Sequence, residues 1–260
     1  MRVGRDEFEV DIAQEQRDSE RYDEGRGLIG GDPAKRPAHV RWRPIPEEQP
    51  YFRLIDISAE KRARLDAFLS DDGAVRNADE SPGTRRPLEI EIGFGSGEFL
   101  LGRAAAHPER RFLGFEVKRD LCRSLVKRGE AVELGNLWVG DDDARWALPQ
   151  LALAGQVDVV HALYPDPWWK RKHQAKRLFS QPFLDLVQAL LVPGGLLHVR
   201  SDVEGYAQHI EALLEEHGGF SANDPALARP FDADPPTRRE AYCRQIGRAF
   251  WVMAFAKRPS

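Results

Sequence analysis

A run of apolar and β-branched residues at 88–92 leads into glycines at every second position, Gly93, Gly95 and Gly97, and helix-forming sequence follows. This pattern predicts a strand that ends in a tight turn. Glycine adopts positive φ without strain and has no Cβ to collide with a ligand, so the backbone can pass close to a bound molecule. We therefore expect a nucleotide or nucleoside cofactor over Gly93, Gly95 and Gly97.

The residues around this turn favour one cofactor. The spacing Gly-x-Gly-x-Gly differs from the Gly-x-Gly-x-x-Gly that holds a pyrophosphate at a helix end. Glu91, at the start of the turn, would repel a pyrophosphate but attract the cationic amine of an amino acid. S-adenosylmethionine carries such an amine and a sulfonium, and it has no phosphate. The sequence therefore favours S-adenosylmethionine.

Acidic residues at the ends of the next two predicted strands are candidates for contacts with the nucleoside. Glu116 ends the next strand, 19 residues after Gly97, where a carboxylate can accept both ribose hydroxyls. Its alternative role is to offset the dipole of the following helix. Asp143 follows the third strand and could bind the adenine amino group. Any of Asp141, Asp142 and Asp143 could instead cap the next helix, so the residue that points to the ligand stays open.

The loop after the fourth predicted strand, residues 163–173, reads Leu-Tyr-Pro-Asp-Pro-Trp-Trp-Lys-Arg-Lys-His. In open α/β sheets a loop at this place lies over the ligand crevice. Pro165 and Pro167 stiffen the backbone around Asp166. A base could stack on an aromatic ring and hydrogen-bond Asp166, with its phosphates against the cations that begin at Lys170. The alternative, a proline-rich turn with core tryptophans, does not explain the adjoining basic run.

Two later segments have the residues of a helix start. Ser201-x-x-Glu204 and Thr237-x-x-Glu240 each fit a capping box, in which a hydroxyl and a carboxylate satisfy the first backbone N–H groups of a helix. Asp202 lies at the first of these helix starts. From the residues alone, these positions are helix caps.

Composition and charge limit the classes of protein that fit. The net charge of the 260 residues is −4, and the first ten residues carry charges of both signs, unlike a secretory signal. No apolar run approaches the roughly 20 residues that span a bilayer. Two cysteines and seven scattered histidines give neither a disulfide framework nor a metal site. We expect a cytoplasmic protein whose basic clusters, at 118–128 and 168–177, meet an anionic partner; for the first cluster a solvated helix face is an equal alternative.

From residue 88 the chain alternates apolar runs with helical segments, which predicts βαβ units and an α/β fold with a mainly parallel sheet. Strands are predicted at 88–92, 111–116, 136–139, 157–163 and 195–200, with a last edge or antiparallel strand at 249–256. Helices are predicted at 58–69, 97–106, 118–131, 144–153, 176–191 and 203–216. We divide the chain into a charged, disordered arm at 1–50, a short helix and linker at 51–86, and one α/β domain at 87–260.

The motifs together resemble one known family, the tRNA (guanine-N7)-methyltransferases. The similar segments are Glu91-Ile-Gly-Phe-Gly, Phe112-Leu-Gly-Phe-Glu116, Tyr164-Pro-Asp-Pro-Trp168 with Lys170, Ser201-Asp202, and Thr237-x-x-Glu240 followed by Ile246-Gly247. The resemblance covers roughly residues 85–258, and Pro-Asp-Pro-Trp is its most specific part. It implies a class I, Rossmann-like fold with a mainly parallel seven-stranded sheet. It also implies methyl transfer from S-adenosylmethionine to N7 of the variable-loop guanine, position 46, of tRNA.

Carried over position by position, the resemblance implies roles for particular residues. Cofactor contacts are implied for Glu91, Glu116, Asp143 and Asp166, with Asp166 also the active-site residue. Substrate contacts are implied for Lys170, Asp202, Thr237, Arg238, Arg239 and Glu240. Bacterial members of the family generally act alone, so we expect a monomer or homodimer without an obligate protein partner.

The chain departs from the family pattern in two places. The arginine-rich N-terminal segment of many members is not evident, and Arg248-Ala-Phe-Trp251 stands where members often have a histidine. Two other functions stay open: a different class I nucleic-acid methyltransferase, and a non-catalytic RNA-binding protein on the same fold. The first would use a Pro-Pro-aromatic loop without an acid between the prolines, unlike Asp166 here. A nicotinamide-dependent dehydrogenase is a distant third.

Overall fold

The computed structural model describes residues 46, 48–70, 85–168 and 176–259. The predictions for the N-terminal arm up to residue 45, the linker at 71–84 and the basic run at 169–175, which includes Lys170, lie outside these residues. The statements below concern the described residues alone.

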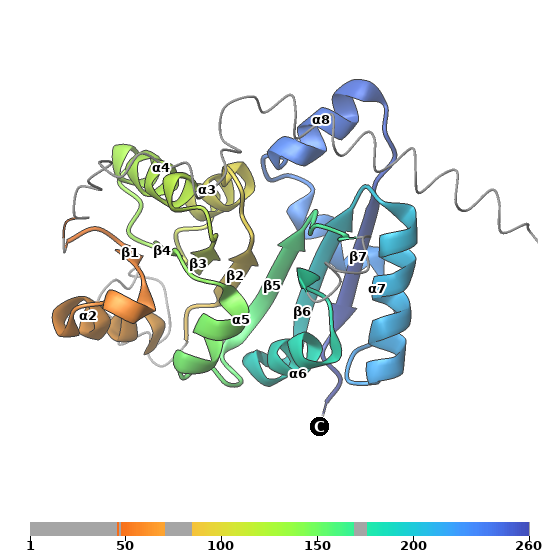
Figure 1. Cartoon of the computed structure of the whole chain (residues 1–260), viewed down its shortest axis with the longest axis horizontal. Helices are drawn as coiled ribbons and strands as arrows, with labels where there is room; N and C mark the ends of the chain where they lie inside the picture. The colour runs from red at the N-terminus through yellow and green to blue at the C-terminus, as the bar shows by residue number, and fades with distance from the viewer. Residues whose placement is uncertain (1–45, 47, 71–84, 169–175, 260) are drawn as a thin grey trace, which may run out of the picture. The chain divides into compact units, whose positions relative to one another are not determined.

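Seven strands of the described chain form one sheet in the order β1-β4-β3-β2-β5-β6-β7 (Figure 1). In chain order they are β1 (Tyr51–Phe52), β2 (Leu88–Ile92), β3 (Arg111–Phe115), β4 (Leu137–Gly140), β5 (Val157–Leu163), β6 (Leu191–Ser201) and β7 (Trp251–Ala256). All neighbours pair in parallel except β6 and β7, which are antiparallel. This confirms the predicted α/β fold with a mainly parallel sheet. The strand order reverses between β2 and β5, which is where ligands bind in open α/β sheets.

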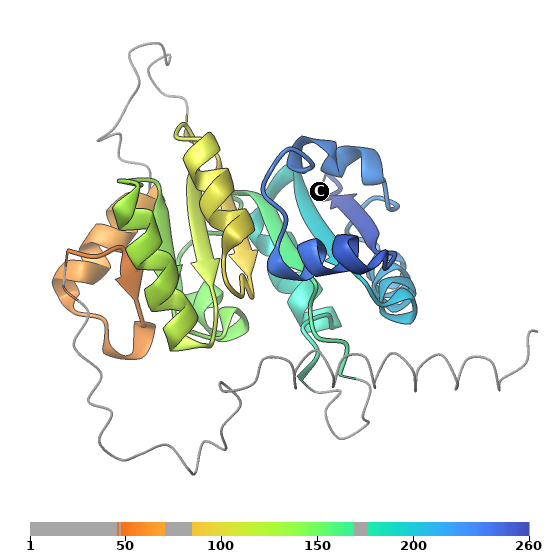
Figure 2. The same cartoon turned by 90° about the horizontal axis from the view of Figure 1, so that it is seen from above.

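Helices cover both faces of the sheet (Figures 1 and 2). They are α2 (Ala59–Ser70), α3 (Glu98–Ala106), α4 (Arg119–Ala131), α5 (Ala144–Ala147), α6 (Gln181–Leu190), α7 (Glu204–His217) and α8 (Arg238–Ile246). Short 3-10 helices occur at Leu54–Asp56 (η2), Leu148–Gln150 (η3) and Pro225–Phe231 (η5). The larger core packs α2, α5, α6 and α7 on one face, and a smaller cluster packs α3 and η5 on the other.

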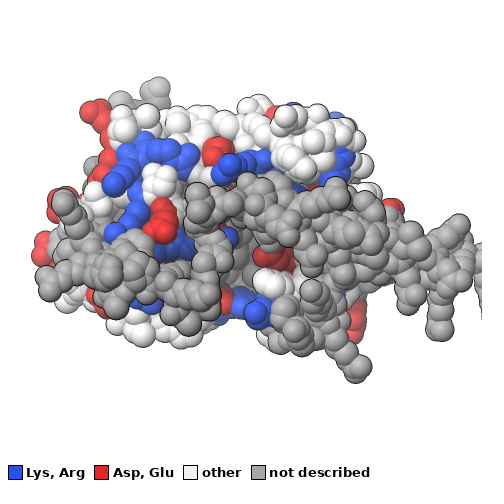
Figure 3. All heavy atoms as spheres, turned by 45° about the horizontal axis from the view of Figure 1, so that its top comes forward, with Lys and Arg blue, Asp and Glu red and all other residues white. Residues whose placement is uncertain are grey.

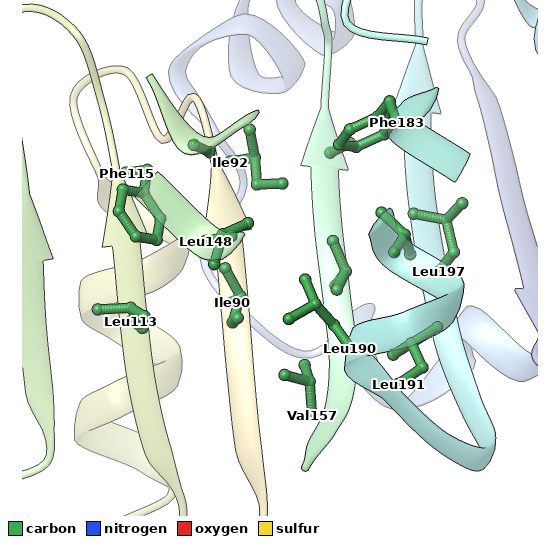
Figure 4. Close-up of a cluster of buried hydrophobic side chains, with 14 of the residues drawn as sticks. Ile90, Ile92, Leu113, Phe115, Leu148, Val157, Phe183, Leu190, Leu191 and Leu197 are labelled. Atoms are coloured by element: carbon green, nitrogen blue, oxygen red, sulfur yellow. The ribbon is translucent and has the colours of Figure 1, made fainter. Parts of the chain in front are cut away.

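Strand β2 shows how the two faces differ. Ile90 and Ile92 belong to the larger core together with Leu113 and Leu190 (Figure 4). Successive side chains of a strand point to opposite faces. The two glutamates of β2 therefore lie on the face of α3, although both are buried. A strand with apolar residues on one face and buried carboxylates on the other needs polar partners or a ligand for those carboxylates.

Two predicted helices differ from the observed ones, and one observed strand was not predicted. The helix predicted at 144–153 ends at Ala147 and continues as a 3-10 turn that contains Pro149, whose missing N–H disfavours further α-helix. The helix predicted at 176–191 begins only at Gln181, after Ser180 in an extended conformation. Strand β1 was not located from the sequence; it pairs with β4 at one edge of the sheet.

A buried polar network crosses the sheet on the α3 face. Glu89 accepts hydrogen bonds from Arg103 at 2.5 and 2.9 Å, and His161 Nε2 lies 2.9 Å from the same carboxylate. The two Nδ1 atoms of His161 and His198 are 2.9 Å apart. Arg200 Nε donates to His198 Nε2 at 3.2 Å. Although burial would raise the pKa of Glu89, the bonds from His161 and Arg103 hold it below its usual range.

One placement of protons satisfies the whole network. Arg200 only donates, so His198 Nε2 carries no hydrogen; ionised Glu89 only accepts, so His161 Nε2 carries one. The remaining contact is then His198 Nδ1–H donating to His161 Nδ1. Burial is the main cause that lowers the pKa of both histidines. Glu89 opposes the shift at His161, whereas His161 and Arg200 add to it at His198, so both rings are neutral.

The neutral histidine pair predicts a loss of stability in acid. Because the folded protein lowers these pKa values below the unfolded value of about 6.5, stability is complete above that pH and is lost as the pH falls through the folded values. We expect His198→Gln, whose amide can accept from Arg200 and donate to His161 but does not titrate, to lose less stability in acid. Urea unfolding between about pH 7 and pH 5 measures this. Equal pH dependence in both proteins would contradict the assignment.

Asn136 predicts a second effect on stability. Its buried Nδ2 lies 2.9 to 3.1 Å from the carbonyl oxygens of Ala104, His107 and Arg110, which close the end of α3 and the following turn. Asn136→Ala leaves these acceptors without their donor, so we expect a loss of about 2 kcal/mol in the free energy of unfolding. Gln150→Ala removes an exposed amide that also bonds a helix carbonyl, and we expect a change below about 0.5 kcal/mol. Similar losses would contradict the role of Asn136.

Candidate active site

The glycine turn follows β2 at the point where the strand order reverses. Gly93, Gly95 and Gly97 all have positive φ, at 73°, 58° and 74°. A Cβ on Gly93 or Gly95 would meet no atom of the described residues within 4 Å, whereas on Gly97 it would lie 2.8 Å from Leu125 of α4. The first two glycines therefore border open space, and Gly97 lies close to the side chain of Leu125.

Glu91 is the buried carboxylate beside this turn. It is 1% exposed, and its Oε2 has no hydrogen-bond partner among the described residues. Burial, followed by the charges of Glu98 and Glu116, raises its pKa to about 8, and Arg200 opposes the shift. A buried acceptor without a partner is costly unless a ligand completes it. A cationic amine placed over the glycine turn would do so.

Glu116 ties the glycine turn to the end of β3. Its two carboxylate oxygens accept hydrogen bonds from the backbone N–H groups of Gly95 at 3.1 Å and Lys118 at 3.0 Å. Burial raises its pKa despite these bonds. A carboxylate has about four acceptor positions, so two remain available for the ribose hydroxyls of a nucleoside. The bond to Lys118, which precedes α4, shows that Glu116 also supports the helix start.

Asp141 and Asp142 hold the edge strand β1 and the turn after it. Asp141 accepts hydrogen bonds from the hydroxyl of Tyr51 and from Arg119 Nε, the latter at 2.6 Å. Asp142 Oδ2 accepts from the backbone N–H of Leu54 at 2.9 Å. Both aspartates are buried. Asp141 and Asp142 therefore have structural roles, because their hydrogen bonds hold β1 and the turn after it.

Asp143 differs from its two neighbours. It is the N-cap of α5, because its carboxylate accepts from the backbone N–H of Arg145 at 3.0 Å, and it also pairs with the Arg145 guanidinium at 2.6 Å. This pairing lowers the pKa of Asp143. The side chain is 43% exposed, in contrast to 5% for Asp141. The capping alternative is thus observed, and a contact of Asp143 with adenine stays a prediction.

The backbone of the loop after β5 is strained at two residues. Tyr164 and Trp168 have φ of 55° and 42°, in a region that bulky residues rarely adopt. Two contacts support it: the backbone N–H of Tyr164 donates to the carbonyl of Arg200 at 2.7 Å, and Arg177 Nε donates to the carbonyl of Pro167 at 2.8 Å. Strain maintained by surrounding contacts is frequent at functional sites.

Asp166 is exposed at the middle of this loop. Its charge contributes to the raised pKa of both Glu116 and Tyr206, after the larger effect of burial on each. The Asp166 carboxylate therefore lies within electrostatic reach of Glu116, which follows β3. Trp168 is covered by a cation, since Lys176 Nζ lies 5.0 Å from its ring centre.

Helix α8 carries the stretch Thr237–Glu240. Thr237 Oγ1 accepts from the backbone N–H of Glu240 at 3.1 Å, so the predicted cap is present. The Glu240 carboxylate does not return to the helix start; it pairs with Arg200 and Arg244, each at 2.5 Å. The capping box predicted at Ser201-x-x-Glu204 is wrong, because Ser201 Oγ accepts from the N–H of Val203 and α7 has no side-chain cap.

Asp202 connects the end of β6 to α8. Its Oδ2 accepts from Arg239 at 2.5 and 3.0 Å and lies 3.5 Å from Arg248 Nη1. Arg238, the neighbour of Arg239, is exposed. Arg200 and Arg248 were not among the site residues found from the sequence, because an arginine that meets a carboxylate about 40 positions away leaves no local pattern.

Both basic and acidic side chains are exposed on the visible part of the face that contains these strand ends. Figure 3 turns the top of Figure 1 forward and shows Lys and Arg atoms in several groups with carboxylates between them. No helix of the described residues is long and apolar enough to cross a membrane. Within the same residues, no group of His, Cys, Asp and Glu side chains is arranged to hold a metal ion.

The fold and the glycine turn define a class I, Rossmann-like methyltransferase. The profile of a family described as "Putative methyltransferase" matches residues 85–253. A solved structure, "Crystal structure of the aminoglycoside resistance methyltransferase NpmB1", has a TM-score of 0.52 and 18% identity over 75% of this chain and 93% of its own. That similarity concerns the fold alone, and it confirms the predicted fold class. Family and fold together imply S-adenosylmethionine as the cofactor.

Two relatives with known names identify the family more specifically. A protein of Anaeromyxobacter dehalogenans named "tRNA (guanine-N(7)-)-methyltransferase" is 42% identical over 173 residues, 65% of this chain and 85% of the relative. A protein of the same name from Alcanivorax borkumensis is 33% identical over 209 residues, 78% of this chain and 87% of the relative. The chain belongs to the tRNA (guanine-N7)-methyltransferase family, as its motifs predicted.

Proposed function

We propose that this protein transfers the methyl group of S-adenosylmethionine to N7 of a guanine in tRNA, the variable-loop guanine at position 46. The observation that carries the proposal is the buried Glu91 carboxylate, whose Oε2 has no partner among the described residues and which lies beside the open glycine turn. The names of relatives with 42% and 33% identity support the substrate.

The residues around the turn suit the cofactor's three polar parts. Glu91 binds the cationic amine, and the backbone at Gly93 and Gly95 leaves room for the amino-acid portion. Glu116 accepts the ribose hydroxyls with the acceptor positions that Gly95 and Lys118 leave free. Asp143 binds the adenine amino group from the partly exposed end of β4.

The reaction needs alignment more than acid or base catalysis. The bound cofactor supplies a methyl group on a positively charged sulfur. Guanine N7 carries a lone pair and no proton, so the chain needs no general base; it must hold N7 in line with the methyl group. Asp166 accepts hydrogen bonds from the N1–H and amino group of guanine, which adenine does not offer in this arrangement. Its negative charge also favours the positive charge that develops on the purine.

The remaining candidate residues would hold the RNA. Lys170 contacts the backbone phosphates beside the target base, as part of the basic run after Trp168. Asp202 and the stretch from Thr237 through Arg238 and Arg239 to Glu240 form the second contact region. The protein works in the cytoplasm, as a monomer or homodimer and without an obligate partner.

The test is a methylation assay followed by identification of the modified nucleotide. The protein is incubated with unmodified tRNA and S-adenosylmethionine labelled in the methyl group. The RNA is then cut into oligonucleotides, which are mapped to the sequence, and the labelled one is digested to nucleosides. We expect the label in 7-methylguanosine from the variable loop. Label on an exocyclic amine would favour a different nucleic-acid methyltransferase. Cofactor-independent RNA binding without transfer would favour a non-catalytic RNA-binding protein.

A further inference from the structure

Arg200, near the end of β6, joins two parts of the candidate site. It is 2% exposed. Its carbonyl oxygen accepts from the N–H of Tyr164, at the start of the loop that carries Asp166, at 2.7 Å. Its Nη1 donates to Glu240 of α8 at 2.5 Å. One residue therefore contacts both the loop after β5 and the helix that bears the second contact region.

The contacts of the Arg200 guanidinium leave it a single orientation. Its Nε donates to His198 at 3.2 Å, and its Nη2 lies 3.4 Å from the carbonyl of Phe231 and 3.3 Å from Asp232 Oδ1. Each nitrogen thus has a partner from β6, η5 or α8. A planar guanidinium can meet these directions at once, and a lysine ammonium cannot. The position of Glu240 is consequently set by the sheet.

The ion pair determines which face of α8 is turned outward. Glu240 is 1% exposed, so its carboxylate points to the protein interior. Arg238 is exposed, two positions earlier on the same helix. A second ion pair also holds α8: Asp202, two residues after Arg200, lies 2.5 Å from Arg239 of this helix. The Glu240 carboxylate is therefore held by its ion pair inside the protein, and Arg238 is an exposed residue of the same contact region.

The loop after β5 also touches the segment after α8. The rings of Tyr164 and Phe250 meet edge to face, with centroids 6.2 Å apart. Arg200 lies between these parts, since it bonds the backbone of Tyr164 and the side chain of Glu240. Its contacts fix the position of α8 relative to the loop that carries Asp166.

We propose that Arg200 is a positioning residue for the RNA: through Glu240 it holds α8 in place beside the Asp166 loop, so that both act on one bound molecule. The proposal rests on the proposed function and assigns a role to a residue that does not touch the reacting atoms. A ligand bound by two regions of a protein gains affinity only when both are held at the matching distance. Loosening α8 should therefore weaken RNA binding more than it slows chemistry.

The first test compares kinetic constants of Arg200→Met, Arg200→Lys and a control, Arg110→Met. Arg110 lies at the other end of the same polar network, where it donates to Glu89 at 2.8 Å. For Arg200→Met we expect KM for tRNA to rise about tenfold, with kcat at saturating tRNA and the Kd of S-adenosylhomocysteine within about threefold of wild type. Arg200→Lys should recover part of the loss, and Arg110→Met should leave KM unchanged. An unchanged KM in Arg200→Met, or an equal rise in Arg110→Met, would overturn the proposal.

The second test does not depend on activity. Hydrogen–deuterium exchange of the α8 amides should be about tenfold faster in Arg200→Met than in wild type, while exchange in β2 and β5 stays the same. Unchanged exchange in α8 would overturn the proposal whatever the kinetics. A wild-type protein that fails to methylate tRNA would refute the proposed function instead, and the exchange result would still decide whether Arg200 positions α8.

Discussion

Asp166→Ala is expected to lower kcat for methyl transfer by about 100-fold to 1,000-fold, the size of effect seen when a fixed charge that stabilises a transition state is removed. The Asp166 carboxylate lies within electrostatic reach of Glu116, whose pKa its charge raises after the larger effect of burial. Without it, the guanine edge has no acceptor and the positive charge on the purine has no counter-charge. Rapid-mixing assays at saturating cofactor and tRNA measure the chemical step.

The fold should not depend on Asp166. The side chain is exposed, and substitutions at exposed positions usually change stability by less than about 0.5 kcal/mol. Asp185→Ala is a matched control, since that aspartate is also exposed and its carboxylate lies 3.2 Å from His217 Nε2. We expect wild-type kcat for the control. Near-normal turnover of Asp166→Ala would refute the assigned role.

Glu91→Gln is expected to weaken cofactor binding by about 100-fold, because it removes one partner of an ion pair in a buried site. The same substitution should not destabilise the protein at neutral or basic pH. The fold raises the pKa of Glu91 from 4.5 to about 8. Between pH 4.5 and about pH 8, Glu91 holds a proton in the folded state that it has released in the unfolded state. The free energy of unfolding therefore falls as the pH rises through this range. Glutamine removes this dependence, and urea unfolding at two pH values measures the difference.

Proton release on ligand binding is an independent test of the role of Glu91. At neutral pH the carboxyl group is protonated, and a cationic amine at Oε2 favours its ionised form. Titration calorimetry with S-adenosylhomocysteine, in buffers of different ionisation enthalpy, should show proton release by wild type and none by Glu91→Gln. A binding enthalpy of wild type that is independent of the buffer would show that Glu91 does not change its protonation state.

Strong local signals in the sequence predicted much of the fold. The apolar run at 88–92 ends in glycines, and β2 has the bounds that this pattern indicates. Asp166, between two prolines, was assigned to a loop after a strand, and it lies in the loop that follows β5. The alternation of strands and helices was enough to predict the parallel sheet, because two neighbouring parallel strands are usually connected by a helix that crosses from the end of one to the start of the next.

Other parts depend on contacts between distant residues and could not be predicted. Strand β1 has two residues, and Tyr51 is held by Asp141, 90 positions away. The roles of Asp141 and Asp142 depend on the same contacts, so the sequence could not separate them from Asp143. The pair of Arg200 and Glu240 spans 40 positions. A capping pattern at Thr237 predicted a helix start, but not that Glu240 faces inward.

The central claim is that N7 of guanine is the atom that receives the methyl group. It is tested most directly with tRNA transcribed from 7-deazaguanosine triphosphate, in which a carbon replaces N7 and the rest of the base keeps its Watson–Crick edge. We expect this RNA to bind and to inhibit methylation of ordinary tRNA, but to accept no methyl group itself. Transfer to the 7-deaza RNA at the rate seen with ordinary tRNA would contradict the account.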